Sequence, residues 1–424
     1  MFKKLLLTIF MINLLWISPS IAQGVIIGWG NNDSNQITPL ILDESIKDID
    51  SGPNSTCFIS ETGIMQCRGC ENPLKNFGQC STDKIPNNWT LQFGGMRTTE
   101  KPMENISTTF AASCGINIDG EVECWGCKPP RQNFQCDIPD NINVVKAKIS
   151  KEPLKGLRTI SLSESHSCVV LKNGEVECWG CEEPENFGQC SPPKNLNSKG
   201  IATGPKHTCS VSTDNSITCW GDDKHDVLNA PLIEEEIIKL VSGHRYNAVL
   251  LKSGKINIWG SGSPKKCLIS SLSTCLELEK KYQSIYSSND YFCTKDIEDN
   301  LNCLRINEGE KLEAISSRKA YDWLSGINIE HLSLDNGVSV AIINNEDYES
   351  NKTELPSAKR MLSQFEYMSS RERLPPTESF LNVECEFENF IGIKFKTIKS
   401  GKFQMGGCST KWECLFSGYN PDDQ

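Results

Sequence analysis

The sequence of 424 residues lacks an excess of positive charge, because 43 Lys and Arg stand against 54 Asp and Glu. The formal net charge is -11, and an acidic chain repels a phosphate backbone, so we expect no nucleic-acid partner. The sequence also lacks a recognisable nucleophile–base pair, metal-ligand cluster or phosphate-binding loop. We therefore predict no catalytic, cofactor-binding or metal-binding residues and no cofactor.

Beyond residue 22 the chain lacks an apolar run that could cross a membrane. Residues 1–22 resemble an export signal, because Lys3 and Lys4 precede a largely apolar run at 5–17 and Ala22 ends a stretch with small residues at the cleavage positions. We predict a signal peptide at 1–22 and a secreted, periplasmic or extracellular protein without further membrane association. An uncleaved anchor is the alternative.

Cysteine is abundant, with 21 residues, and in an exported chain this number implies disulfide bonds. The cysteines belong to a repeat that is clearest at residues 168–180, Cys-Val-Val-Leu-Lys-Asn-Gly-Glu-Val-Glu-Cys-Trp-Gly. Further copies begin at Cys57, Cys114, Cys209 and Cys293, and a cysteine-free copy covers residues 248–260. A short apolar strand precedes each copy, so the pattern predicts repeated β-hairpins.

The two cysteines of each copy are ten residues apart, and this spacing specifies the turn between them. If they face each other across a hairpin, the loop has three residues and its last position has a left-handed backbone. These last positions carry residues that tolerate positive φ, namely Gly63, Gly120, Gly174, Asn215, Gly254 and Asp299. A two-residue turn would place the cysteines on opposite faces of the hairpin. We therefore predict a cross-strand disulfide in each cysteine-bearing hairpin.

A second cysteine pair follows the first in three copies, and cysteines that are missing are missing in pairs. Ala248 and Ile258 replace both members of one first pair. The predicted disulfides are Cys57–Cys67, Cys70–Cys80, Cys114–Cys124, Cys127–Cys136, Cys168–Cys178, Cys181–Cys190, Cys209–Cys219, Cys293–Cys303 and a displaced second pair, Cys267–Cys275. Segments such as Cys178-Trp-Gly-Cys181 leave two alternatives, half of a zinc site or a redox motif. The redox use needs a helix at the motif, whereas here a strand runs into a loop.

Counting the units indicates a closed ring. Seven strand-plus-hairpin units begin near Ile46, Ile106, Leu157, Ile201, Ile237, Tyr282 and Ile329. The seventh has no Trp-Gly strand after it, but residues 26–30, Ile-Ile-Gly-Trp-Gly, form an orphan copy of that strand. We expect the last unit to borrow this strand, which leaves no free sheet edge. The predicted fold class is all-β, a seven-bladed β-propeller over residues 23–345 closed by the N-terminal strand.

The repeat also resembles a known family. His207-Thr-Cys209, followed by Ile217-Thr-Cys219-Trp-Gly, resembles the bacterial, secreted, Cys-rich form of the regulator-of-chromosome-condensation type repeat. The resemblance covers about residues 25–343 and implies a seven-bladed propeller with this strand closure. Arg68 and Leu304 stand where the family has Trp. Insertions at about 81–105 and 137–156 interrupt the period.

The histidines and tryptophans of the repeat are expected to be structural. His166, His207 and His244 would have to converge to act as ligands, and a ring spreads such positions apart. The tryptophans at the strand ends are expected to be packing anchors, namely Trp125, Trp179, Trp220 and Trp259.

The C-terminal part differs in composition. Residues 346–383 are predicted to be a polar linker. Residues 389–406 contain a predicted β-hairpin with a turn at Ser400-Gly401. The Gly-x-x-Phe-x-x-Ile-x-x-Gly-x-Phe-x-Met-Gly pattern there resembles the start of a formylglycine-generating enzyme or sulfatase-modifying factor domain, which implies a C-type-lectin-like fold.

We expect residues 384–424 to be an incomplete domain of this kind, cut short in an interrupted reading frame. The resemblance implies catalytic cysteines farther toward the C-terminus, so none is assigned here. Cys385, Cys408 and Cys414 leave one thiol without a partner, which suits a truncated domain.

Function does not follow from the fold alone. The resemblance to secreted propellers, one of which inhibits a β-lactamase, implies a protein partner on a propeller face, and the long insertions could contribute to that face. The nuclear nucleotide-exchange role of the family's namesake does not suit an exported, acidic chain. The predicted function is therefore a non-catalytic protein-binding module. The alternative is part of a formylglycine-generating enzyme family protein, an enzyme or a peptide-binding lectin-like domain, whose catalytic portion is missing from this chain.

Overall fold

The computed structural model describes residues 24–70, 76–80, 101–127, 134–260, 280–306 and 328–347, with a few one- or two-residue gaps inside these ranges. It also describes residue 350 and short strands at 312–314, 380–381, 387–388, 394–395 and 400–401. The chain divides into two compact units, Met1–Ser357 and Ala358–Gln424. The predicted export signal and most of the predicted linker and C-terminal domain lie outside the described residues.

Six antiparallel sheets of the first unit are built from consecutive strands. The first three are β3 (Ile46–Ser51), β4 (Ser55–Ser60), β5 (Met65–Gly69); β6 (Met103–Thr108), β7 (Ala112–Asn117), β8 (Val122–Gly126); and β9 (Ile160–Leu162), β10 (Ser167–Val170), β11 (Val176–Trp179). The next three are β12 (Ser198–Thr203), β13 (His207–Ser212), β14 (Ile217–Gly221); β15 (Ile237–Ser242), β16 (Asn247–Leu251), β17 (Ile256–Trp259); and β18 (Tyr282–Ser287), β19 (Tyr291–Asp296), β20 (Leu301–Ile306), β21 (Leu312–Ala314).

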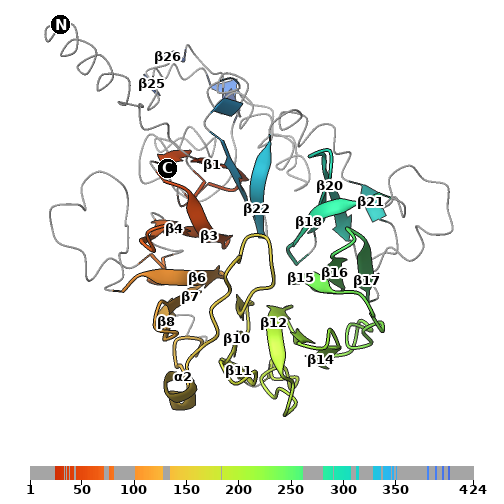
Figure 1. Ribbon diagram of the computed structural model, residues 1–424. Coiled ribbons are helices and arrows are strands. Elements are labelled where there is room, and N and C mark those ends of the chain that lie inside the picture. The colour runs from red at the N-terminus through yellow and green to blue at the C-terminus, as the bar shows by residue number, and fades with distance from the viewer. Residues whose placement is uncertain are drawn as a thin grey trace, which may run out of the picture. The chain divides into compact units, whose positions relative to one another are not determined.

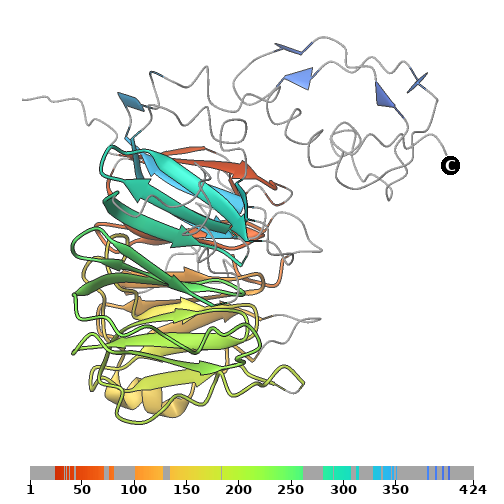
Figure 2. The ribbon, with the colours of Figure 1, turned by 90° about the vertical axis from the view of Figure 1, so that its right-hand side faces the viewer.

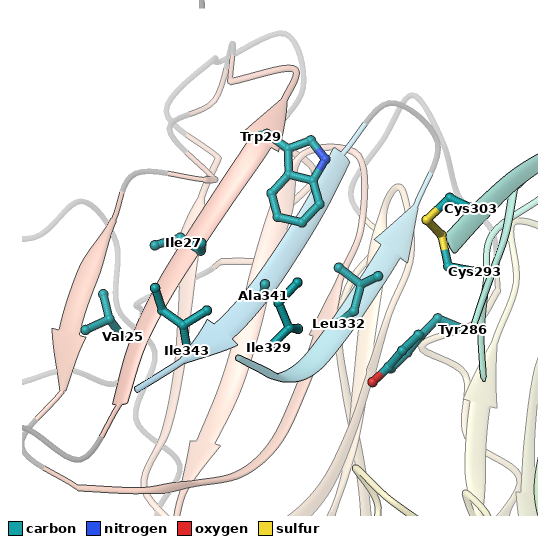
Figure 3. Packing of buried hydrophobic residues seen from close by; sticks show 10 residues of the cluster. All are labelled: Val25, Ile27, Trp29, Tyr286, Cys293, Cys303, Ile329, Leu332, Ala341 and Ile343. Carbon is teal, nitrogen blue, oxygen red and sulfur yellow. A yellow bond between two sulfur atoms is a disulfide. The ribbon is translucent and has the colours of Figure 1, made fainter. Parts of the chain in front are cut away.

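The seventh sheet joins the two ends of the first unit and confirms the predicted closure. Its order is β2 (Leu40–Leu42), β1 (Gly24–Gly30), β23 (Val338–Ile343) and β22 (Ile329–Asp335). β1 pairs antiparallel with β23, with Val25 opposite Ile343 and Gly30 opposite Val338. Figure 3 shows the apolar side chains that hold this junction, among them Val25, Ile27 and Leu332. Because Val25 and Ile27 are fully buried there, the N-terminal strand is part of the core.

The first strands of the seven sheets form a closed ring. Each contacts the next in the order β3, β6, β9, β12, β15, β18 and β22, and β22 contacts β3. We number the seven sheets as blades in this order. The sheets surround a centre in Figure 1, and in the side view of Figure 2 the strands run across the thickness of the ring. The architecture is therefore a seven-bladed propeller with the hairpin turns on its two faces.

The hairpins between the second and third strands have the predicted turn. In the first blade, Ser60 N–H donates to Ile64 O at 3.0 Å and Gly63 N–H donates to Ser60 O at 2.9 Å, which leaves a three-residue loop. All six predicted last positions have positive φ: Gly63 81°, Gly120 81°, Gly174 85°, Asn215 69°, Gly254 88° and Asp299 67°. The ten-residue spacing therefore specified the turn correctly.

Two further segments complete the described elements. The helix α2 (Asp140–Val145) lies between the second and third blades in sequence. In the second unit, β24 (Phe380–Leu381) pairs with β27 (Ser400–Gly401), and β25 (Phe387–Glu388) pairs with β26 (Lys394–Phe395). The prediction of a turn at Ser400-Gly401 is therefore wrong. Both residues belong to a strand whose partner begins twenty residues earlier, and a reading of local propensity does not detect such a partner.

Candidate functional site: a polar plug at the centre of the ring

Within the described residues, five of the seven blades have a disulfide across the predicted hairpin, and three of these five have a second disulfide in the loop that follows. The structure contains Cys57–Cys67, Cys114–Cys124, Cys168–Cys178, Cys209–Cys219 and Cys293–Cys303 across hairpins, and Cys70–Cys80, Cys127–Cys136 and Cys181–Cys190 in the loops that follow. These eight are all among the nine pairs that the spacing predicts.

The Cys-x-x-Cys segments are not closed on themselves, because each of their cysteines bonds to a cysteine outside the segment. Cys178, for example, bonds to Cys168 and Cys181 bonds to Cys190. The predicted pair Cys267–Cys275 and the cysteines Cys385, Cys408 and Cys414 lie outside the described residues. In the part of the chain that the structure describes, no three His, Cys, Asp or Glu side chains are grouped so that they could hold a metal ion.

The histidines of the repeat connect neighbouring blades, as predicted for structural residues. His166 is buried, and its Nε2 lies 2.7 Å from Thr208 Oγ1 of the next blade. His207 is buried in the same way, with Nε2 2.8 Å from Asn247 Oδ1. His244 contacts the ring of His225 edge-on, at 5.5 Å between the ring centroids. These histidines lie at different blade junctions and do not form one site.

The tryptophans are buried anchors between blades. Their indole N–H groups donate to carbonyls in the loop that follows the preceding blade: Trp125 to Gln79 O, Trp179 to Gln135 O, Trp220 to Gln189 O and Trp259 to Val227 O, at 2.7–2.9 Å. In three of these cases a loop disulfide, such as Cys181–Cys190, holds the accepting segment. The second disulfide of a blade therefore fixes the contact made by the next blade.

The centre of the ring carries the feature that sequence reasoning missed. In six blades the first strand contains a β-bulge of one residue, such as Lys47 between the pairs Ile46–Ser60 and Asp48–Ile59. In the third blade the corresponding pairs are Ala147–Leu171 and Thr159–Val170, because Val170 N–H donates to Thr159 O. Residues 148–158 therefore replace the single bulge residue. We call this segment the plug loop.

The later part of the insertion predicted at 137–156 thus lies within the first strand of the third blade, whereas its earlier part forms α2 before that strand. That unit begins at Ala147, earlier than the expected Leu157, because the loop splits the strand in two. Figure 1 shows the segment between α2 and β10 extending to the centre of the ring. Ser150 Oγ donates to Leu157 O at 2.8 Å and Gly156 N–H donates to Glu152 O at 2.6 Å, which close the neck and the tip of the loop.

The residues that follow the bulge in the other six blades surround the plug loop. We call them the central cluster: Asp48, Asn105, Gly200, Lys239, Ser284 and His331. They occupy equivalent positions in a repeat, but their side chains differ. This variation is explained by the loop, because each position meets a different part of it or supports a neighbour that does.

Polar contacts hold both ends of the plug loop. At the C-terminal end, Arg158 Nη2 donates to Asp48 Oδ1 at 2.9 Å and Nη1 donates to Ile106 O at 2.7 Å. At the N-terminal end, Asn105 and Ser150 exchange hydrogen bonds at 2.9 and 3.1 Å. The loop is thereby attached to the first and second blades.

The tip of the loop meets the fifth and seventh blades. Lys239 Nζ donates to Leu154 O at 3.2 Å and to Ser284 Oγ at 3.0 Å, and lies 4.5 Å from the ring centroid of Tyr286. The backbone of Leu154 also acts on His331, because it raises the pKa of this histidine against the larger effect of burial. Gly200 admits the loop, since a Cβ there would lie 2.6 Å from Leu157 Cβ. The plug loop therefore contacts strands of five other blades.

Burial makes the ionised forms of the central cluster unfavourable. Burial raises the pKa of Asp48 to about 6, and Arg158 offsets this only in part. Burial, together with Arg158, lowers the pKa of Lys239 to about 7. Burial lowers the pKa of His331 well below its usual value, and Lys239 and Arg158 lower it further. With the plug loop in place, the charged forms of Asp48, Lys239 and His331 lose hydration that their neighbours replace only in part.

Two groups of the central cluster have unused binding capacity within the described residues. Among the described residues, Lys239 Nζ forms no ion pair with a carboxylate, and Asp48 acts on it only from a longer distance. The ring Nδ1 of His331 is buried and has no hydrogen-bond partner in the part of the chain that the structure describes. Burying polar groups without full partners costs stability, so these side chains are candidates for a role other than packing.

No family model matches the chain, and no curated protein matches it in sequence. Solved structures share its fold. Prp20p from Saccharomyces cerevisiae is 16% identical, with a TM-score of 0.53, over 79% of this chain and 96% of that one. Yeast RCC1 (Prp20), solved with Kap60 bound, is 15% identical, with a TM-score of 0.54, over 79% and 92%. Human WBSCR16 is 14% identical, with a TM-score of 0.51, over 76% and 99%.

These likenesses define the class of protein: the chain has an all-β, RCC1-like seven-bladed propeller fold. At such identities they show the fold alone. Eight disulfides are typical of a protein of an oxidising compartment. Among the described residues, no helix has the length and apolar character needed to span a membrane.

Proposed function

We propose that this chain is an exported, non-catalytic propeller that binds other proteins through one face of the ring. The observation that carries the proposal is a row of exposed apolar side chains on the face with the turns between second and third strands. Ile64 and Ile118 stand at these turns in the first and second blades, and Val144 lies on α2; they are 48%, 54% and 81% exposed. Exposed apolar residues that gather on one face favour a protein interface.

Backbone contacts place these residues on neighbouring segments. Ile118 N–H donates to Pro102 O at 2.9 Å, and Gly63, next to Ile64, packs against the same proline. Lys146, at the end of α2, forms an ion pair with Glu121 at 2.9 Å in the hairpin turn next to Ile118. Apolar side chains framed by charged ones have the composition of a protein interface with a polar rim.

The fold and the disulfides support the same proposal. Prp20p was crystallised in a study of its binding to Gsp1p and histones, and yeast RCC1 was solved with Kap60 bound, so propellers of this fold bind proteins. The disulfides suit an extracellular environment, in which exposed loops need protection from unfolding and proteolysis.

The test is capture of partners from the extracellular fraction of the source organism by residues 23–347. We expect Ile118→Asp combined with Val144→Asp to abolish capture, because a charge in the contact is costly to desolvate. Leu232→Asp is the matched control, since Leu232 is fully exposed outside this row. Equal capture by both variants would contradict the proposed face. Partners that the full chain captures but residues 23–347 do not would instead favour a function in the C-terminal part.

The second candidate function belongs to that C-terminal part. The pattern at Gly392 to Gly406 favours a sulfatase-modifying factor type module, an enzyme or peptide-binding domain, which we propose as separate from the propeller. Its test is the coding sequence beyond codon 424. A frame that continues the domain supports this module, whereas an unrelated coding region directly after residue 424 contradicts it.

A further inference from the structure

We propose that the central cluster is a binding site for the C-terminal carboxylate of a partner peptide, and that the plug loop occupies this site as an intramolecular ligand. The inference rests on the proposed protein-binding function and names a second, chemically defined contact for it. It is independent of the apolar row on the hairpin face.

The first argument is the way the loop is held. The other six blades close with a single bulge residue, so the ring does not need a longer segment at this position. The plug loop is nevertheless bound as a peptide ligand would be, through the backbone of Ser150 and Leu154 and through the side chain of Arg158. The buried Pro153 and the partly buried Leu154 form its tip, whereas Lys151 and Lys155 beside them are exposed.

The second argument is the chemistry that the loop leaves unsatisfied. Lys239 donates to a neutral carbonyl at 3.2 Å where a carboxylate would give a shorter, charge-assisted hydrogen bond. Lys239 donates to the carbonyl of Leu154, and the backbone of Leu154 also raises the pKa of His331, so both side chains lie beside this residue. A peptide that ends at the position of Leu154 would place two carboxylate oxygens between them. Capture of a C-terminal carboxylate by convergent donors is a recurrent mode of peptide recognition.

The third argument is that the plug loop is not strongly held in its position on the central cluster. In its ion pair Asp48 is buried and Arg158 is partly buried, and such a pair contributes little net stability because desolvation opposes the Coulomb attraction. Lys239 is buried, and among the described residues its Nζ has no direct ion pair, only the more distant charge of Asp48. A ligand carboxylate that pairs directly with Lys239 therefore competes favourably with the loop.

The test uses the full chain with residues 148–157 deleted. This deletion leaves Arg158 as a one-residue bulge between Ala147 and Thr159, the arrangement that Lys47 has in the first blade. The probe is the N-acetylated peptide Lys-Ile-Ser-Lys-Glu-Pro-Leu, residues 148–154, with either a free C-terminal carboxylate or an amide. Binding is measured by titration calorimetry, after non-reducing peptide mapping has shown that the eight disulfides are formed.

We expect the carboxylate peptide to bind at least about tenfold more tightly than the amide, the difference typical of a charge-assisted hydrogen bond. Lys239→Met in the deletion variant should abolish this preference. Lys199→Met is the matched control, because Lys199 is the bulge residue of the fourth blade and bonds to Asn215 instead. Equal affinities for the two peptides, or no binding to the folded deletion variant, would overturn the proposal.

A second measurement uses the intact chain and tests the proposal even if the deletion variant does not fold. In the intact chain, the carboxylate peptide should displace the loop and speed trypsin cleavage after Lys151 and Lys155, and the amide should do so less. No difference between the two peptides in the intact chain would reject the proposed site. Both measurements use a synthetic peptide, so failed partner capture by the hairpin face would leave their outcome unaffected.

Discussion

The third and fifth blades have the same hairpin but opposite cysteine content. The third carries Cys168–Cys178 across its hairpin and Cys181–Cys190 behind it, whereas the fifth has Ala248 opposite Ile258 and no disulfide in its described residues. Both have a left-handed glycine in the turn and a buried Trp at the strand end. The blade is therefore defined by its turn, its register and its tryptophan, and the disulfide reinforces a hairpin that forms without it.

Replacing the tryptophans should lower the free energy of unfolding most and should best distinguish the third blade from the fifth. We expect Trp179→Ala and Trp259→Ala each to lower the free energy of unfolding by about 3–5 kcal/mol, because each removes a buried indole. The fifth blade should also open locally, since no disulfide holds its hairpin. Urea unfolding measures the first effect, and trypsin cleavage near Lys252 and Lys255 measures the second. Equal protease sensitivity of the two variants would contradict the role given to the disulfide.

Exchanging the cysteine content should have the next largest effect. Cys168→Ala with Cys178→Ala should cost about 2–3 kcal/mol, the amount expected for a loop of this length. Ala248→Cys with Ile258→Cys should form a bond and add stability, because the two residues are directly opposite each other, as the cysteines of the other blades are. Thiol titration and urea unfolding, with Ala248→Cys alone as the control, check both changes. Free thiols in the double variant would show that the fifth hairpin is not equivalent.

Acid should distinguish the blades that use histidine from the fifth, which has Tyr246 at the equivalent position. Burial lowers the pKa of His166 to about 3 and that of His207 to about 4. The unfolded chain takes up these protons below its ordinary histidine pKa of about 6.5, whereas the folded chain does not. Stability should therefore fall as the pH drops from 6.5 toward the folded values, by roughly 2 kcal/mol per histidine by pH 5.

His166→Asn should remove part of this dependence in urea unfolding at pH 7.5 and pH 5. Asp48 has the opposite effect, because burial raises its pKa in the folded chain to about 6. Between pH 6 and pH 4 the folded chain binds this proton more readily than the unfolded chain, so the free energy of unfolding rises as the pH falls. Asp48→Asn is therefore a useful second variant. An unchanged pH slope in His166→Asn would show that this histidine does not titrate as described.

The turn glycines should give the smallest effect and should be alike in both blades. Gly174→Ala and Gly254→Ala place a Cβ at φ values of 85° and 88°, which costs about 1–2 kcal/mol for an L-residue. Asn215→Gly in the fourth blade should be nearly neutral or slightly stabilising, since its φ is 69°. Thermal unfolding of the three variants is the measurement. A larger loss in the third blade than in the fifth would mean that the disulfide strains the turn.

The sequence allowed much of the ring to be predicted because the repeat imposes the same chemistry at the same position. A left-handed turn needs Gly, Asn or Asp, and the indole needs a carbonyl in the preceding loop, so these residues recur visibly. The orphan Trp29 strand was detectable for the same reason.

The central cluster could not be predicted because its positions do not share a residue type. Asp48, Lys239 and His331 are equivalent in the fold but are selected by different parts of one loop, which lies elsewhere in the sequence. The insertion was visible as a break in the period. Its place inside a bulge, however, depends on the pairing of Ala147 with Leu171, which no local pattern marks.

The pairing of β1 with β23 makes closure of the ring depend on both ends of the propeller being present. β1 is synthesised before any blade, yet its neighbour in the ring is made about three hundred residues later. Until then, Val25 and Ile27 lack the surface that buries them, and the sheet edges at both ends are open to other chains. In a polypeptide that stops before β23, the ring cannot close and β1 stays an unpaired edge, which is prone to aggregation. The ring therefore closes only after the last blade has been synthesised.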